Sequence, residues 1–297
     1  MNEIEFLAER FETHRSHLRA VAYRMLGSLS EADDAVQEAW LRLDRSGAEG
    51  VANLGGWLTT VVGRVCLDML RSRTSRAEEP LDVRVPDPLV SRAADVVDPE
   101  HEVLLADSVG LALLVVLDTL DPAERLAFVL HDMFGMPFDE IAPMVGRTTA
   151  AARQLASRAR RRVRGAAPEP DADLDRQWEV VDAFMAAARA GDFDALLSVL
   201  DPDVLLRADA GAGRPGGARE VRGAREVAGQ ALLFRSPGGV ARRALVNGAP
   251  GIVASAGGRV RSVLGFTITG GRIVEIDILA DPERLGRLGW LDAETEF

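Results

Sequence analysis

Apolar residues recur at three- and four-residue spacing through most of the first 76 positions, which is the period of amphipathic helices. The repeat is clear at Leu18, Val21, Ala22 and Met25, and it resumes over 35–43. A glycine-containing connection, RSGAEGVANLGG, separates these positions from another helical run, WLTTVVGRVCLDMLRSR. Residues 1–77 are therefore expected to form an all-α bundle.

The helical pattern stops over residues 78–107. This stretch holds four prolines and nine acidic residues, and its net charge is −7. Prolines at such density break helices and favour extended chain. We predict an acidic linker over 78–107.

Helical periodicity returns near Ser108. Asp121 followed by Pro122 predicts the start of a helix, and Gly135 predicts its end. A short helix, a tight turn at Gly146 and a longer helix over 148–164 come next. This order is typical of a helix-turn-helix, so 108–165 is expected to be a second all-α domain.

A second linker is predicted over 166–175, and the pattern beyond it changes from helical to mixed. Amphipathic helices come first, VRGAREVAGQALLF is expected to be a helix, and strands alternate with turns from Val240 to Leu279. Residues 176–297 are therefore expected to be an α+β domain in which helices pack on a curved antiparallel sheet.

Charge identifies one candidate binding surface. The formal net charge of the chain is −11, yet residues 147–164 contain seven arginines and no acid. A helix inserted into a duplex groove has phosphates on both sides, so arginines on several of its faces are useful there. The alternative interpretation is a solvated helix face. At the N-terminal end of this helix, Arg153 and Gln154 could read guanine and adenine through bidentate hydrogen bonds.

Three stretches of the sequence resemble parts of one protein family. AYRMLGSLSEADDAVQEAWLRL with GWLTTVVGRVCLDMLRSRTSR resembles region 2 of bacterial RNA polymerase sigma factors of the extracytoplasmic-function type. LDTLDPAERLAFVLHDMFGMPFDEIAPMVGRTTAAARQLASRARRRVR resembles their region 4. The resemblance covers about 1–164 in the family's order. It implies an alternative sigma factor that binds core RNA polymerase and directs it to a promoter with −35 and −10 elements.

The resemblance also implies roles for particular residues. The residues expected to bind core polymerase are Asp33, Asp34, Gln37 and Glu38. Those expected to contact the −10 element are Asn53, Arg64, Asp68, Arg71 and Arg73. Those expected to contact the −35 element are Arg147, Thr148, Thr149, Arg153, Gln154, Arg158 and Arg161. The acidic linker resembles the segment that passes through the polymerase cleft, where its charge could imitate nucleic acid; the alternative is a plain spacer.

The C-terminal domain resembles the SnoaL-like, NTF2-like cone fold, and its fusion to a sigma factor resembles the sigma factor J-like group. Pro168-Glu169-Pro170 matches the end of that group's Trp-Leu-Pro-Glu-Pro motif. Residues 209–214 resemble its Asp-Gly-Gly-Gly-Arg/Lys loop, and 281–285 resemble its Asn-Pro-Asp-Lys-Leu motif. We therefore expect regulation in cis, with ordinary turn chemistry as the alternative for both later motifs. The candidate contact residues are Pro168, Glu169, Pro170, Asp209, Arg214, Asp281, Pro282 and Leu285.

The chemistry available in this domain argues against catalysis. Residues 171–297 contain no His, Cys, Lys or Tyr, so a general base would have to be an aspartate: Asp201, Asp203, Asp209 or Asp277. The sequence predicts that the protein is not an enzyme and has no cofactor and no metal. An apolar ligand in the cone is a further candidate partner.

Targeting signals and cysteine content indicate where the protein is located. The sequence shows no signal peptide and no membrane span, and its single cysteine, Cys66, is expected in a core; these features predict a cytoplasmic protein. The alternative function is a ligand-responsive helix-turn-helix repressor. Such a repressor would bind its operator without core polymerase.

Overall fold

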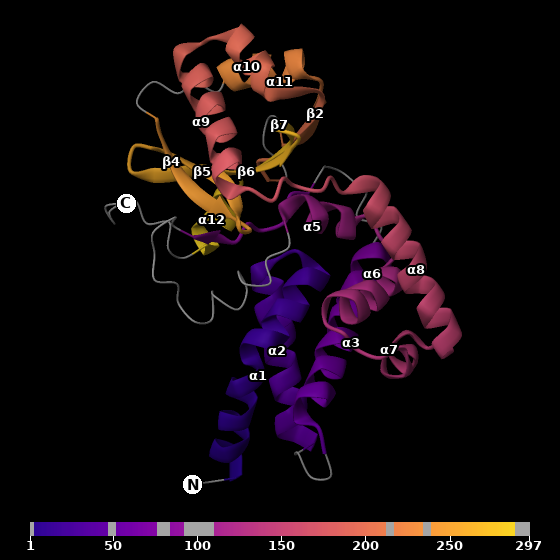
Figure 1. Cartoon of the computed structure of the whole chain (residues 1–297). Coiled ribbons are helices and arrows are strands. Elements are labelled where there is room, and N and C mark those ends of the chain that lie inside the picture. The colour runs from indigo at the N-terminus through magenta and orange to yellow at the C-terminus, as the bar shows by residue number, and fades with distance from the viewer. Residues whose placement is uncertain are drawn as a thin grey trace. The chain divides into compact units, whose positions relative to one another are not determined.

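The computed structural model describes residues 3–46, 52–75, 84–91, 110–211, 217–233 and 239–288 (Figure 1). The chain forms two compact units, and neither is continuous in sequence. The first comprises 1–79, 98–107 and 116–166. The second comprises 80–97, 108–115 and 167–297, so part of the predicted acidic linker belongs with the C-terminal domain.

Three helices form the N-terminal part of the first unit: α1 (Glu3–Leu26), α2 (Leu29–Ser46) and α3 (Leu54–Ser75). The apolar positions that predicted these helices are buried between them, including Leu18 and Met25. Cys66 is fully buried, which confirms its interpretation as a core residue, and burial raises the pKa of its thiol to about 12. Trp40 packs edge-on against Phe11 with ring centroids 5.2 Å apart.

The helix-turn-helix is formed by α6 (Pro122–Phe128), a π-helical turn η1 (Val129–Met133), α7 (Phe138–Val145) and α8 (Thr149–Ala166). Asp121 caps α6 by accepting a hydrogen bond from the Ala123 amide at 2.9 Å. Gly135 and Gly146 have φ of +69° and +65°, a conformation in which glycine avoids the Cβ clash. The predicted helix start, helix end and turn are therefore confirmed. Helix α5 (Leu111–Asp118) precedes them.

The helix-turn-helix and the three N-terminal helices share one core. Arg125 of α6 is only 1% exposed, and it donates to the Asp118 carboxylate at 2.7 Å and to the Arg24 carbonyl at 3.4 Å. At Gly63 of α3, an added Cβ would lie 2.5 Å from the Met144 side chain of α7. Gly63 lets α3 and α7 approach closely because it has no Cβ to clash with Met144. The hydrogen bond from Arg125 to the Arg24 carbonyl links α6 to α1.

The second unit is built on a seven-stranded sheet with strand order β1-β4-β5-β6-β7-β2-β3. The strands are β1 (Val90–Ser91), β2 (Leu200–Asp209), β3 (Ala218–Arg222), β4 (Val240–Val246), β5 (Ala249–Ala256), β6 (Arg259–Thr269) and β7 (Arg272–Leu279). The expectation of a purely antiparallel sheet is wrong, because β2 runs parallel to β7. The helix expected from 221 onward is also shorter than predicted, since Val221 and Arg222 pair with β2.

Helices α9 (Leu174–Ala190), α10 (Phe193–Val199) and α11 (Ala224–Leu233) pack on one face of this sheet. Alternate residues of β2 point into that core, among them Val204, Leu206 and Ala208. The residues between them, such as Arg207 and Asp209, belong to the opposite face because side chains alternate along a strand. The chain continues from β7 into a short helix, α12 (Pro282–Arg287). In the ranges that the structure describes, every helix is too short or too polar to cross a bilayer.

Candidate nucleic-acid interface and linker contact

Three arginines of α8 are used inside the first unit. Arg158 donates to Glu124 at 2.6 Å, and Arg162 donates to the other oxygen of the same carboxylate at 3.3 Å. Arg160 donates to Asp132 at 2.7 Å, and this hydrogen bond raises the pKa of its guanidinium. These contacts attach one side of α8 to α6 and η1, so part of the arginine run has a structural role.

The N-terminal end of α8 is open to solvent. Thr148 caps the helix by accepting from the Ala151 amide at 3.2 Å, and Thr149 and Gln154 are exposed. The guanidinium of Arg153 lies 5.5 Å from the centroid of the Phe138 ring. Within the described ranges, three further arginines are exposed and have no carboxylate partner: Arg147, Arg161 and Arg164. The helix thus presents free cations beside polar side chains that can read base edges.

A second surface lies on α2. Asp34 and Gln37 are exposed, while Asp33 accepts from Arg19 at 2.6 Å and Glu38 accepts from Arg42 at 2.9 Å. The four predicted residues therefore share a helix face, although two of them already have arginine partners. Sequence reasoning missed Leu41 on this face. Leu41 lies four residues after Gln37 and is 44% exposed, so it adds an apolar side chain to this helix face.

The predicted −10 residues of α3 are divided between structural and exposed positions. Asn53 precedes α3 and accepts from the Gly56 amide at 3.0 Å, which caps that helix. Arg64 is exposed, whereas Asp68 and Arg71 lie 4.0 Å apart as a weak ion pair. Arg73 pairs with Glu31 of α2 and also donates to a backbone carbonyl of α1. Arg64 and Arg71 are therefore better placed than Arg73 to contact a phosphate.

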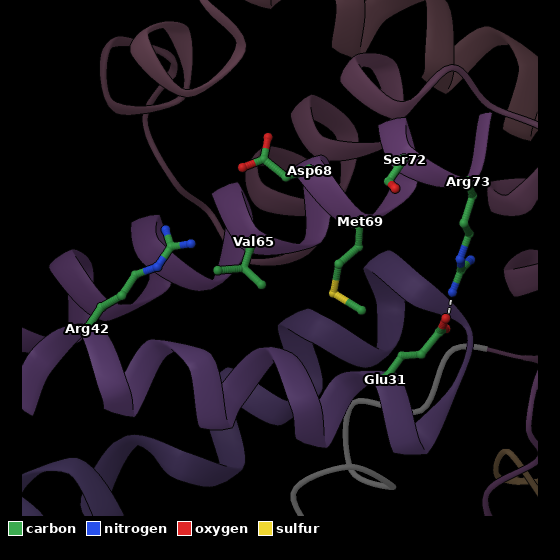
Figure 2. A pocket seen from close by; sticks show the side chains of 7 residues that line it. All are labelled: Glu31, Arg42, Val65, Asp68, Met69, Ser72 and Arg73. Atoms are coloured by element: carbon green, nitrogen blue, oxygen red, sulfur yellow. Dashed lines mark hydrogen bonds and ion pairs between the residues drawn. The ribbon is translucent and has the colours of Figure 1, made fainter. Parts of the chain in front are cut away.

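A shallow pocket of about 350 Å³ lies between α2 and α3. Figure 2 shows Val65 and Met69 between Arg42 on one side and Arg73 on the other. Val65 and Met69 are apolar, and the arginine at each end has a carboxylate partner: Arg73 pairs with Glu31, which also lines the pocket, and Arg42 pairs with Glu38. The complete lining is Glu31, Arg42, Val65, Asp68, Met69, Ser72 and Arg73. Asp68 and Arg73 of this lining belong to the predicted −10 set. Arg42 is the ion-pair partner of Glu38, which belongs to the predicted polymerase-binding set.

In the second unit, Arg284 of α12 joins the linker to the sheet. Its Nε donates to Asp87 at 2.7 Å, its Nη1 donates to Asp209 at 2.7 Å, and its Nη2 donates to the Val85 carbonyl at 2.6 Å. All three polar side chains are at least 85% buried. Asp209 also accepts from the Val85 amide at 3.3 Å. We call Asp87, Asp209 and Arg284 the linker clamp.

The linker also adds a strand to the sheet. Val90 and Ser91 pair with the edge strand β4 in antiparallel register. Asn247 forms two hydrogen bonds with Leu89: its side-chain Oδ1 accepts from the Leu89 backbone N–H at 3.0 Å, and its own backbone N–H donates to the Leu89 carbonyl at 2.6 Å. Asn247 is the one non-glycine residue with positive φ in the described part of the chain. Its side chain and its backbone conformation both serve this contact.

The other predicted regulatory residues have different surroundings. Thr269 donates to the Glu169 carbonyl at 2.8 Å, so Pro168-Glu169-Pro170 runs beside the β6–β7 turn. Asp281 caps α12, Pro282 is its first residue, and Leu285 is buried. Arg214 lies outside the described residues. Sequence reasoning missed a second Pro-acid-Pro segment, Pro86-Asp87-Pro88, which is the one that reaches Arg284.

A buried ion triad lies beside the clamp on the same sheet face. Arg207 donates to Glu275 at 3.1 Å and to Asp277 at 3.2 Å. Burial raises the pKa of Asp277 to about 6, although the charge of Arg207 opposes the shift. Two of the four aspartates considered as a catalytic base, Asp209 and Asp277, are thus engaged with arginines. Asp201 caps a local turn by accepting from the Asp203 amide.

Comparisons with known proteins place both helical regions in one family. Residues 10–76 match the Sigma-70 region 2 family model, and residues 110–163 match the Sigma-70 region 4 model. The chain is 40% identical to the ECF RNA polymerase sigma factor SigJ of Mycobacterium tuberculosis over 92% of its own length and 91% of the relative's. The chain is an extracytoplasmic-function sigma factor. As such, it binds core RNA polymerase and directs promoter-specific initiation, and the repressor alternative is not supported.

The relationship of this sigma factor extends through its C-terminal domain. It is 37% identical to the probable ECF sigma factor SigI of M. tuberculosis, with 97% of the chain and 98% of the relative covered. It also matches the crystal structure of SigJ with a TM-score of 0.73 and 37% identity, covering 93% of this chain and 97% of the other. The predicted combination of two sigma regions with a C-terminal α+β domain is confirmed.

Proposed function

We propose that the C-terminal domain regulates this sigma factor in cis by holding residues 84–91, part of the connection between regions 2 and 4. The linker clamp is the observation that carries this proposal. All three side chains of the contact are charged and buried, and one guanidinium donates to two carboxylates and a backbone carbonyl. A buried ion pair with complete hydrogen bonding is specific in geometry, and it is costly to leave half-formed.

The clamp can act as a brake because it restricts the chain between two DNA-reading regions. A sigma factor reads −35 and −10 elements that are separated along the duplex, where each base pair adds about 3.4 Å. The connection must span that distance in the polymerase complex. A linker whose residues 85–91 are held on the sheet has fewer extended conformations than a free one. Covalent tethering gives the contact an effective concentration in the millimolar range, so modest contacts suffice.

We further propose the contact surfaces that follow from the described geometry. The α2 face with Asp34, Gln37 and Leu41 binds core polymerase. Arg64 and Arg71 of α3 hold the −10 strand, and the exposed N-terminal end of α8 reads the −35 element.

Regulation by contact is favoured over catalysis and over a ligand. Asp209 and Asp277 are paired with arginines, which leaves neither carboxylate as an unengaged base. Side chains from α9, α10 and the sheet form a continuous apolar cluster that includes Phe184, Leu206 and Phe266. We therefore propose a non-catalytic domain, in a protein that works in the cytoplasm beside RNA polymerase.

Runoff transcription with purified core polymerase tests the proposal. The full chain is compared with Arg284→Ala and with the charge-preserving Arg284→Lys on one promoter. We expect Arg284→Ala to change initiation by several-fold and Arg284→Lys to change it less, because a lysine can keep one of the ion pairs. Equal activity of all three proteins at limiting sigma concentration would refute regulation through the clamp.

A further inference from the structure

Arg153 is held between its own helix and an aromatic ring of the preceding helix. Phe138 is the first residue of α7, and its ring centroid lies 5.5 Å from the guanidinium carbon of Arg153. A cation within about 6 Å of a ring face is attracted by the ring's quadrupole, by about 0.5–1 kcal/mol at an exposed site. Arg153 is exposed and forms no ion pair within the described residues, so its contact there is with the Phe138 ring.

The Phe138 ring has a second contact. His131 stacks on Phe138 with centroids 3.7 Å apart and an interplanar angle of 28°. His131 Nδ1 lies 2.9 Å from the Met136 carbonyl, and since a carbonyl only accepts, this nitrogen carries the proton. The hydrogen bond sets the orientation of the imidazole, and the imidazole sets that of the phenyl ring.

The backbone between His131 and Phe138 departs from a regular α-helix. His131 belongs to the π-helical turn η1, in which one extra residue rotates the side chains that follow. Gly135, in the left-handed region, then reverses the chain so that Phe138 returns over His131. The π-helical turn thus carries His131, and Gly135 lies between His131 and Phe138 in the chain.

We propose that Phe138, backed by His131, is a positioning residue that sets the Arg153 guanidinium for base reading at the −35 element. This inference rests on the proposed assignment of Arg153 to that element. A free arginine loses rotamer entropy when it forms a bidentate contact with guanine, and an arginine already held in place loses less. Phe138 contributes by preorganising Arg153 and has no base contact of its own.

The experiment is a double-mutant cycle read out as promoter discrimination. Initiation with core polymerase is measured on a reference promoter and on promoters with each −35 base pair replaced. Arg153→Ala identifies the base pair that Arg153 reads, as the position where discrimination is lost. At that position we expect Phe138→Leu to reduce discrimination about two- to fivefold, which corresponds to the cation–π energy above. In the Arg153→Ala background, Phe138→Leu should have no further effect.

Two controls separate positioning from folding. Phe193→Leu removes a matched pair in the C-terminal domain, where Arg225 lies 5.4 Å from the Phe193 ring, and it should not change −35 discrimination. Fluorinated phenylalanines at position 138 keep the shape of the ring but weaken its negative face. Discrimination should then fall step by step with the number of fluorine atoms, even if Phe138→Leu destabilises the helix-turn-helix.

The outcomes decide the inference independently of the linker clamp. Additive effects of Phe138→Leu and Arg153→Ala, or a fluorine series without any trend, would overturn it. Arg153→Ala without any loss of discrimination would overturn both the assignment of Arg153 and the inference. None of these results depends on Arg284, whose variants test regulation separately.

Discussion

The Arg284 guanidinium and the Asp87 carboxylate are 197 positions apart in sequence, and they are joined by a 2.7 Å hydrogen bond. The contact connects the last described helix of the C-terminal domain to the middle of the linker between two sigma regions. Asp209 shares the same guanidinium at 2.7 Å. Removal of Arg284 would therefore leave two carboxylates buried near each other without a cation, an arrangement that costs about 3–5 kcal/mol in comparable buried sites.

Proteolysis measures release of the linker directly. Trypsin cleaves after arginine and needs the neighbouring residues to be accessible as well. Arg84 is exposed but the next residue, Val85, is fully buried, so we expect slow cleavage after Arg84 in the wild type. We expect Arg284→Ala to increase the cleavage rate after Arg84 by at least tenfold. Cleavage after the exposed Arg176 serves as the internal control and should not change. An unchanged rate after Arg84 would mean that β1 pairing and the Asn247–Leu89 hydrogen bonds hold the linker without Arg284.

The proposed polymerase-binding surface of α2 is tested at Leu41. An exposed leucine in a polar surface contributes to binding when a partner covers it, and full burial is worth about 1.5–3 kcal/mol. We expect Leu41→Ala to weaken binding to core polymerase about tenfold. The unfolding temperature of the free protein should change little, since the side chain is 44% exposed. The exposed Leu174 in the C-terminal domain offers a matched control, and Leu174→Ala should bind normally.

Adjacent arginines of α8 should differ in how they affect DNA binding. Arg161 has no carboxylate partner among the described residues, whereas Arg162 donates to Glu124. We expect Arg161→Ala to lower affinity on all promoters and to reduce the slope of log affinity against log salt by about one unit. Arg162→Ala should reduce that slope less, because its charge is already partly neutralised. Equal slopes for the two variants would contradict this difference.

The sequence predicted most local structure because each signal was local. The Asp121-Pro122 start and the glycine turns at 135 and 146 depend only on neighbouring residues. The linker contact was not predictable in this way. A proline-rich acidic stretch indicates extended chain, but nothing in it specifies that Val90 pairs with Val246 or that Asp87 meets Arg284.

Charge patterning alone also could not show which arginines of α8 have partners within the protein. On α8, Arg158, Arg160 and Arg162 have carboxylate partners from residues 28 to 38 positions away. Those partners, Glu124 and Asp132, lie on other helices, so helix periodicity in 147–164 could not reveal them. The parallel pairing of β2 with β7 was missed for a related reason: strand patterns give the alternation of faces but not the partner.

The buried triad predicts an unusual dependence of stability on pH. The pKa of Asp277 is raised from 3.8 to about 6, chiefly by burial, so the folded protein binds a proton at this site more readily than the unfolded chain. Asp277 therefore contributes up to about 3 kcal/mol to the free energy of unfolding at pH below about 4, and this contribution is lost as the pH rises through 6. Asp277→Asn removes the titration and keeps an oxygen for Arg207. Urea unfolding of both full-length proteins, followed at pH 4.5 and pH 7, should show the variant gaining stability relative to the wild type at the higher pH. A stability difference between the two proteins that stays constant across this range would show that Asp277 titrates at its ordinary pKa, held charged by Arg207.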